Sequence, residues 1–195
     1  MTRSRRPDDW GKDLEGARAS ERALAEALSA HPGIHSLTDH TDAFDLLDFS
    51  FTFGQERVFV DIKEKRQPYS FGIEGLWPIV ESSNLFILDE TVYRRIIWQG
   101  GGGYLVVRDH PGKRWALFGP WELTLGPRVR YQRWGQRGDN RFLKGKLLLN
   151  INAAALVTER FSVDDLLRVI ENSRARVQSV AAIATTEQPI PVVGR

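Results

Sequence analysis

The sequence predicts an α/β domain, and three observations point to this class. Apolar residues recur at helical spacing near both ends of the chain, in residues 13–30 and 162–184. Between them, the runs 47–53 and 57–63 alternate apolar and polar residues on either side of Gly54, as a β-hairpin does. We therefore expect a helix, then a mixed sheet that starts antiparallel, with further helices on the faces of the sheet.

Length and composition are those of a single folded domain. The chain has 195 residues, of which 42% are hydrophobic, and this is enough for a full core. It has no cysteine, which excludes a disulfide framework and a thiolate zinc site. No apolar run approaches the ~20 residues of a membrane span, and the polar start lacks a signal peptide's apolar region. We expect a cytoplasmic domain over residues 13–184, no membrane partner, and flexible ends at 1–12 and 185–195.

The first helix is expected at residues 13–30, and His31-Pro32-Gly33 ends it. Its apolar face consists of Leu14, Ala17, Leu24 and Leu28. A first strand follows at Ile34–His40. The hairpin comes next, and Gly54-Gln55 suits a two-residue type II′ turn because glycine occupies its first central position.

Short elements fill the middle of the chain. Asp89 is expected to cap a helix at Glu90–Gln99, with Gly100–Gly103 as its C-terminal cap and connector. The expected strands are Asn84–Leu88, Tyr104–Arg108, Arg114–Phe118 and Leu147–Ile151, and Trp121–Leu125 is a helical turn or a strand.

The last helix begins at Ser162, and Asp165 three residues later completes a start that resembles a capping box. Its apolar stripe runs from Val163 to about Ala184. This stripe either covers the sheet or pairs with a second copy of the chain, so a homodimer or a larger complex through this helix is one expectation.

The turn of the hairpin determines which charged residues share a face. A turn at Gly54-Gln55 sets Asp48 opposite Asp61, and a turn at Gln55-Glu56 sets Asp48 opposite Lys63. Both registers place the three charged residues on one face, whereas a three-residue loop would move Asp48 to the other. Asp45 falls on the opposite face in both registers, unless a bulge intervenes.

Two carboxylates and an ammonium on one sheet face have two interpretations. The first is an ordinary cross-strand ion pair on a solvated face. The second is a metal site, because Mg²⁺ binds one or two carboxylates together with phosphate oxygens and water. A nearby lysine can then orient the attacking water and stabilise charge on the phosphorus. Phe59 shares this face, which favours the second interpretation.

Asp48, the apolar hairpin and the segment Val58–Lys63 resemble the core of the PD-(D/E)XK nuclease superfamily. The proline of that name is absent here. Many members, particularly those like Holliday-junction resolvases, carry a glutamate on a helix before the hairpin. Glu21 matches it by its place before the apolar pair Leu24 and Leu28. The resemblance covers residues 14–110.

This resemblance implies a restriction-endonuclease-like mixed β-sheet flanked by helices, and Mg²⁺-dependent hydrolysis with Mn²⁺ as a substitute. Asp48, Asp61 and the main-chain carbonyl of Ile62 would hold the metal. Glu21 would be a further ligand, either directly or through water, and Lys63 would position the attacking water.

Positive charge gathers in one segment, residues 128–146, although the net charge of the chain is only +2. Asp139 is the single acidic residue there, against Arg128, Arg130, Arg133, Arg137, Arg141, Lys144 and Lys146. Tyr131, Trp134 and Phe142 are interleaved with them. Cations with aromatic platforms are what a nucleic-acid surface requires. A solvated loop whose aromatic residues belong to the core is the alternative.

Together these patterns predict a Mg²⁺-dependent endonuclease that hydrolyses DNA phosphodiester bonds, with structure-specific cleavage as one form of that activity. Three alternatives remain. They are a non-catalytic DNA-binding subunit on the same fold, a nuclease directed at RNA, and a protein-interaction module whose basic segment meets an acidic partner.

Overall fold

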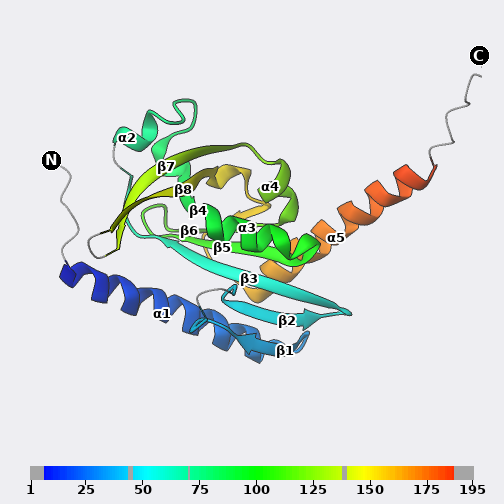
Figure 1. Cartoon of the computed structure of the whole chain (residues 1–195). Coiled ribbons are helices and arrows are strands. Elements are labelled where there is room, and N and C mark those ends of the chain that lie inside the picture. The colour runs from blue at the N-terminus through cyan, green and yellow to red at the C-terminus, as the bar shows by residue number, and fades with distance from the viewer. Residues whose placement is uncertain (1–6, 44–45, 70, 138–139, 187–195) are drawn as a thin grey trace, which may run out of the picture.

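The computed structural model describes residues 7–43, 46–69, 71–137 and 140–186, and Figure 1 shows its arrangement. The helices are α1 (Pro7–Ala30), α2 (Phe71–Glu74), α3 (Glu90–Trp98), α4 (Pro120–Leu125) and α5 (Val163–Thr186), with 3₁₀ turns at Ser82–Asn84, Gly100–Gly102 and Ile151–Ala153. The strands are β1 (Ile34–Asp39), β2 (Phe49–Phe53), β3 (Glu56–Lys65), β4 (Leu85–Asp89), β5 (Gly103–Asp109), β6 (Arg114–Phe118), β7 (Arg128–Arg137), β8 (Asn140–Asn150) and β9 (Leu156–Thr158).

The strands form two sheets. The larger has the order β1-β2-β3-β5-β6-β9, and the smaller has the order β4-β8-β7. In the larger sheet β3 and β5 are parallel, and the other neighbours are antiparallel. The predicted α/β class and the antiparallel start of a mixed sheet are therefore confirmed.

Each face of the larger sheet has its own core. One face, with Phe49, Val60 and Val106, packs on α1 and on the first half of α5. The opposite face, with Leu105 and Val107, packs on α3, α4 and the smaller sheet. Figure 1 shows α1 and α3 on opposite sides of β3. We call the second face the inner face, because the smaller sheet lies across it.

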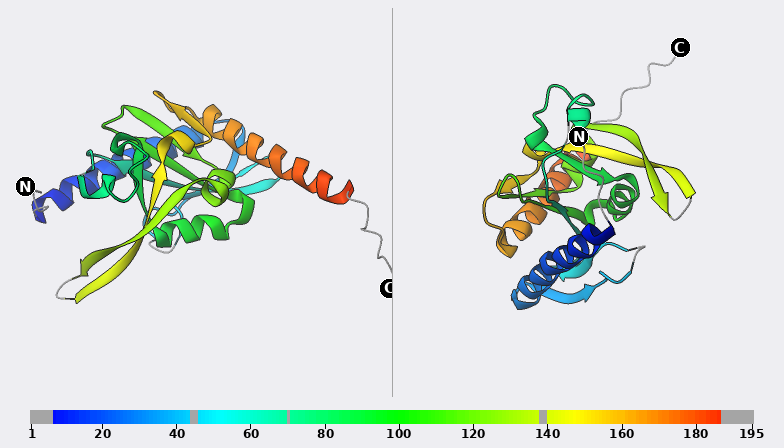
Figure 2. Two further views of the ribbon diagram at one scale, coloured as in Figure 1. Left: turned by 90° about the horizontal axis from the view of Figure 1, so that it is seen from above. Right: turned by 90° about the vertical axis from the view of Figure 1, so that its left-hand side faces the viewer.

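The C-terminal helix covers the sheet with its first half only. Val163, Leu166 and Ile170 are buried, and the Ser162 hydroxyl accepts the Asp165 N–H, as the predicted cap requires. Val177 and Val180 continue the stripe but are 50% and 53% exposed. Figure 2 shows this half of α5 extending away from the body. None of the helices in the described residues is both long and apolar enough to cross a membrane.

Three local expectations were wrong. Helix α1 begins at Pro7, not at residue 13, because proline suits the first turn and Asp8 and Asp9 favour a helix N-terminus. Asp89 makes no side-chain cap of α3, because its carboxylate pairs with lysines of β8. The alternation expected from residue 47 onward begins only at Phe49, because Leu47 precedes β2 and packs in the inner-face core, not with Phe49 and Phe51.

The basic segment forms most of a long hairpin, β7–β8, where the sequence predicted only the strand 147–151. Val129 and Tyr131 pack on one side of it with Leu148, and Leu147 and Leu149 pack on the other. This is alternation with a period of two, which the arginines obscured. The alternative of a solvated loop over residues 128–146 is therefore wrong. Its second part is correct for Tyr131, which packs in a core.

Candidate active site

The candidate site lies where β2 and β3 diverge. Their ladder runs from Phe53↔Glu56 to Phe49↔Val60, which leaves Gly54-Gln55 as the two-residue turn. Of these two residues only Gly54 has a positive φ, +63°, as a type II′ turn requires. The predicted register with a turn at Gly54-Gln55 is therefore confirmed for these pairs, and one pair further it would set Asp48 opposite Asp61.

The carboxylate of Asp48 accepts a β3 hydrogen bond at the point where pairing with β2 has ended. Its Oδ2 accepts the Ile62 N–H at 2.8 Å, beyond the last β2–β3 pair. The main-chain N–H and C=O of one strand residue point to the same edge, so the Ile62 carbonyl also faces this gap. The His40 N–H donates to the Asp48 carbonyl at 2.8 Å and helps to hold the residue there.

Three oxygens converge on a single cation at this point, the Lys63 ammonium. Nζ lies 2.8 Å from Asp61 Oδ2 and 3.2 Å from Asp48 Oδ2, and 3.0 Å from the Ile62 carbonyl. Apart from Glu21, these are the oxygens that the sequence assigned to a metal. The Lys63 side chain is 34% exposed, so it has an open path out of the cluster.

Asp61 is the most buried member of the cluster. It is 2% exposed, and among the described residues no hydrogen bond reaches its Oδ2, which forms an ion pair with Lys63 Nζ. Burial raises the pKa of Asp61, Lys63 lowers it and Asp48 raises it, and the net result is a pKa of about 7. Burial disfavours the charged form of Lys63, but Asp61 and Asp48 outweigh it and raise the pKa of that ammonium.

Glu21 reaches this cluster from α1. Burial raises the pKa of its carboxyl, and the neighbouring Asp48 raises it further, while Lys63 lowers it. The helix is fixed on both sides of Glu21. The Ser20 hydroxyl donates to the Glu64 carboxylate, and Leu24 and Leu28 are buried in the core beneath the sheet. The structure therefore brings Asp48, Asp61 and Lys63 into contact, and Glu21 lies close enough for Asp48 and Lys63 to shift the pKa of its carboxyl.

The donor set fits a hard divalent cation. Mg²⁺ needs only one or two carboxylates, and water and phosphate oxygens complete its shell. Asp48, Asp61 and the Ile62 carbonyl can hold such an ion, with Glu21 through water. Within the described ranges no three His, Cys, Asp or Glu side chains gather as a metal cluster. Asp45 lies outside the described residues.

Sequence reasoning missed a polar group beside the carboxylates on the same sheet face. Ser50 is buried, and its hydroxyl contacts His40 Nε2 at 2.8 Å and accepts from Arg57 at 2.7 Å. Alternation placed Ser50 on the Asp48 face. Side-chain alternation could not assign His40 to a face of the sheet, because His40 follows the end of β1 and lies in a turn.

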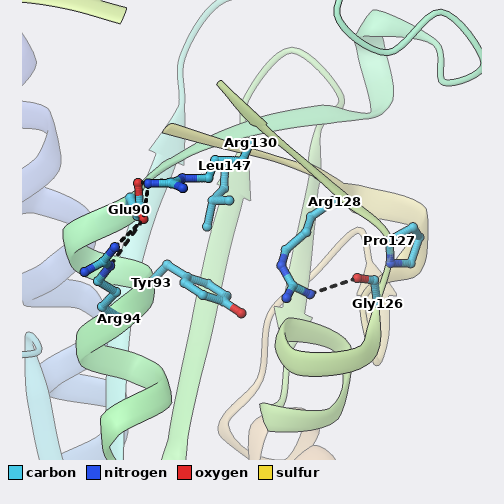
Figure 3. A pocket seen from close by; sticks show the side chains of 8 residues that line it. All are labelled: Glu90, Tyr93, Arg94, Gly126, Pro127, Arg128, Arg130 and Leu147. Atoms are coloured by element: carbon cyan, nitrogen blue, oxygen red, sulfur yellow. Dashed lines mark hydrogen bonds and ion pairs between the residues drawn. The ribbon is translucent and has the colours of Figure 1, made fainter. Parts of the chain in front are cut away.

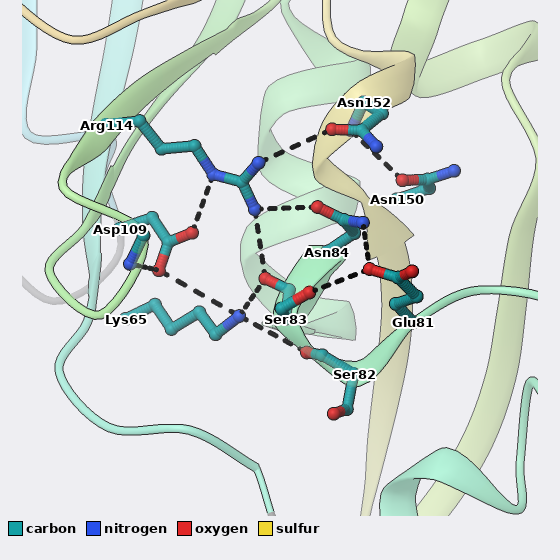
Figure 4. Close-up of polar contacts among 10 residues, drawn as sticks. Lys65, Glu81, Ser82, Ser83, Asn84, Asp109, Arg114, Asn150 and Asn152 are labelled. Carbon is teal, nitrogen blue, oxygen red and sulfur yellow. Dashed lines mark hydrogen bonds and ion pairs between the residues drawn. The ribbon is translucent and has the colours of Figure 1, made fainter.

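A second network fixes the end of β3, two residues beyond Lys63 (Figure 4). Lys65 is 2% exposed, and its ammonium donates to the carbonyls of Ser82 and Ser83. Asp109 lies 3.9 Å from it and pairs with Arg114. Burial lowers the pKa of Lys65, and Asp109 opposes that shift. The network ties the turn before β4 to the strands that carry the site.

Much of the predicted basic surface is neutralised by acids from other elements. Glu90 pairs with Arg130, and Asp89 pairs with Lys144 and Lys146. Arg128 donates to the carbonyls of Leu123, Thr124 and Gly126. Arg133 is exposed, and no carboxylate of the described residues pairs with it. The side chains of Arg137 and Arg141 lie outside the described part.

A pocket of about 530 Å³ opens between α3 and the base of the β7–β8 hairpin. Figure 3 shows Glu90 between Arg94 and Arg130, with Arg128 across the pocket. Arg94 and then Arg130 lower the pKa of Glu90 by hydrogen bonding to its carboxylate. The Arg128 guanidinium lies 5.4 Å from the centre of the Tyr93 ring. A side chain at Gly145 would collide with the Glu90 carboxylate, so this glycine makes room for it.

Comparison of the chain with protein-family models, curated proteins and solved structures finds no match.

Proposed function

We propose that this chain is a metal-dependent nuclease of the PD-(D/E)XK superfamily, with a restriction-endonuclease-like core, and that it hydrolyses DNA phosphodiester bonds. The observation that carries the proposal is the convergence of Asp48 Oδ2, Asp61 Oδ2 and the Ile62 carbonyl on one cation. An ordinary surface ion pair does not need a carboxylate that is 2% exposed.

Each residue then has a distinct role. Asp48 and Asp61, with the Ile62 carbonyl, would hold a Mg²⁺ ion, which would supply activation of water and offset charge on the phosphoryl oxygens. Glu21 contributes through a bound water from the side of α1. Lys63 moves out of the cluster toward solvent, where its ammonium orients the attacking water and contacts the phosphate.

The β7–β8 hairpin supplies the contact with the rest of the substrate. A cluster of carboxylates repels a phosphate backbone, so cations elsewhere must hold the DNA strand near it. Arg133 contributes as an exposed cation of the hairpin, and Arg130 lies on the hairpin face whose Leu147 packs in the inner-face core. Arg128, Arg130, Lys144 and Lys146 line the base of the hairpin, where they combine this task with structural pairing.

The test is cleavage of branched, single-stranded and duplex DNA with Mg²⁺, with Mn²⁺ or with EDTA. Asp61→Ala and Lys63→Ala should each abolish cleavage and leave DNA affinity nearly unchanged. Glu21→Gln should reduce cleavage, and its matched control is Glu26→Gln, an exposed glutamate of α1 that lies outside the site. Unaltered cleavage in EDTA, or by Asp61→Ala, would eliminate the nuclease proposal. Binding of DNA without cleavage in any metal would leave a non-catalytic subunit.

The metal ligands can be tested separately from activity. A crystal soaked in Mn²⁺ should show the ion bonded to Asp48 and Asp61, and not to Asp45. Metal bound to Asp45, with Asp48 turned away from Asp61, would show that the assignment from the hairpin register is wrong.

A further inference from the structure

The far half of the β7–β8 hairpin is a ribbon of only two strands. Strand β4 pairs with β8 from Asn150 to Lys146 and no further, while β7 pairs with β8 out to Arg137↔Asn140. Figure 2 shows this part projecting beyond the body. A two-stranded ribbon is marginally stable on its own, so apolar groups on it need an explanation.

Two apolar side chains face each other across this ribbon. Trp134 pairs directly with Leu143, and they are 67% and 50% exposed. Trp134 therefore presents a large ring to solvent beside a cross-strand apolar neighbour. The exposed Arg133 precedes it and is paired across the ribbon with Lys144, which sets two cations directly opposite each other. Lys144 also pairs with Asp89, and this carboxylate offsets the repulsion between the two cations.

The register fixes the direction in which Trp134 faces. Trp134 and Leu143 share their face of the hairpin with Arg130 and Leu147, because residues alternate along each strand. Leu147 packs in the inner-face core with Leu105 and Val107 of the larger sheet. Asp61 and Lys63 pair with those same two residues of β5 and share their face. The face of the hairpin that carries Trp134 is therefore the one turned toward the sheet face that carries the carboxylates.

Cations continue along this same face toward the body. Arg130 lies four residues before Trp134, ~13 Å along the strand at about 3.3 Å per residue. Arg94 and Arg128 join it at the pocket, and among the described lining residues Glu90 is the single carboxylate. The face thus combines an exposed aromatic ring at one end with an excess of guanidinium groups at the other.

We infer that Trp134, backed by Leu143, is a stacking platform for an unpaired base of a DNA strand whose backbone follows the arginines toward the site. A base in a duplex presents only its edges in the grooves, whereas an unpaired base offers its flat face to an aromatic ring. The inference rests on the proposed DNA nuclease function and specifies its substrate: single-stranded DNA, or the unpaired part of a branched molecule.

The test compares two labelled probes by fluorescence anisotropy in EDTA, so that binding is measured without cleavage. The probes are an oligothymidylate of about 16 nucleotides, the upper site size of single-strand modules, and a blunt duplex of equal length. Trp134→Ala should weaken oligothymidylate binding about 5- to 150-fold, which corresponds to ~1–3 kcal/mol for one stacked base. Its affinity for the duplex should change less than about twofold.

Two further variants separate stacking from other causes. Trp134→Phe should retain most of the affinity, because a smaller ring still stacks. Trp98→Ala removes a tryptophan that is 84% exposed at the end of α3, and it should have no effect. All three variants should melt at the temperature of the wild-type protein, because neither tryptophan belongs to a core.

The outcomes distinguish failure of the stacking platform from failure of the proposed DNA nuclease function. Equal losses for both probes with Trp134→Ala, or no loss for either, would overturn the stacking platform while DNA binding stands. Failure of the wild-type protein to bind either probe would overturn both proposals. Sedimentation that shows a dimer in the wild-type protein and a monomer in Trp134→Ala would overturn the platform in favour of a contact between two copies of the chain.

Discussion

Replacing Asp61 by asparagine should stabilise the protein at high pH, and the gain should shrink as the pH falls. The pKa of this carboxyl is about 7 in the folded protein against an ordinary value of 3.8, chiefly because it is buried. The folded state therefore favours the protonated acid. The contribution of Asp61 to stability is present below its unfolded pKa and is lost as the pH rises through its folded pKa.

The size of the effect follows from that shift. Between pH 5 and about pH 7 the unfolded carboxyl is ionised while the folded one keeps its proton, and each pH unit costs ~1.36 kcal/mol. The free energy of unfolding of the wild-type protein should thus fall by roughly 2–3 kcal/mol relative to Asp61→Asn between pH 5 and pH 8. Asparagine keeps the shape of the side chain and cannot ionise.

Urea denaturation of both proteins at pH 5 and pH 8 measures this difference. Asp42→Asn, at an exposed position near the same hairpin, is the control for the chemical change itself. An Asp61→Asn difference that is the same at both pH values would refute the reasoning. Excess Mg²⁺ at pH 8 should raise the melting temperature of the wild-type protein but not that of Asp61→Asn, because only the wild-type protein retains both carboxylate ligands.

Two predictions concern the salt dependence of DNA binding, in which each phosphate contact contributes about 0.7–0.9 to the slope of log affinity against log salt. Glu90→Gln should steepen this slope and raise DNA affinity, because it releases the guanidiniums of Arg94 and Arg130 from their shared carboxylate. An unchanged slope would mean that the pocket does not contact DNA. A triple alanine variant should flatten the slope by about two units without loss of cleavage at saturating DNA, and unchanged binding would favour an acidic protein partner. The triple variant changes Arg130, Arg133 and Arg137.

The local geometry of the site was predictable because it depends on the alternation of side chains along two strands and on one glycine at their turn. Alternation in β2 and β3, with Gly54 at the turn, was enough to predict the observed ladder and the hairpin face on which Asp48 and Asp61 meet Lys63. The position of Glu21 needed more than sequence spacing, since it depends on how α1 lies on the sheet. The resemblance to a known family supplied that expectation, and the burial of Leu24 and Leu28 is consistent with it.

The charge of the basic segment was not predictable in the same way. A count along residues 128–146 includes only acids that are near in sequence. The acids that neutralise this segment, Asp89 and Glu90, come from the junction of β4 and α3 and reach it through the pairing of β4 with β8. The role of Gly145 was also not predictable from nearby sequence. Its lack of a side chain matters because the Glu90 carboxylate, from a distant part of the chain, lies against it.

The parallel pairing of β3 with β5 has a consequence for the order in which the site assembles. A tight hairpin such as β2–β3 closes in about 1–10 μs, because its contacts are local in sequence. The pairing of Asp61 with Leu105 must instead close a loop of more than forty residues, which is a slow, entropically costly step. We therefore expect Asp48 and Asp61 to meet early, while water still surrounds them, and to lose their hydration only when β5 docks. Substitutions of Leu105 or Val107 should slow folding more than those at the hairpin turn if this docking is rate-limiting, which stopped-flow refolding can measure.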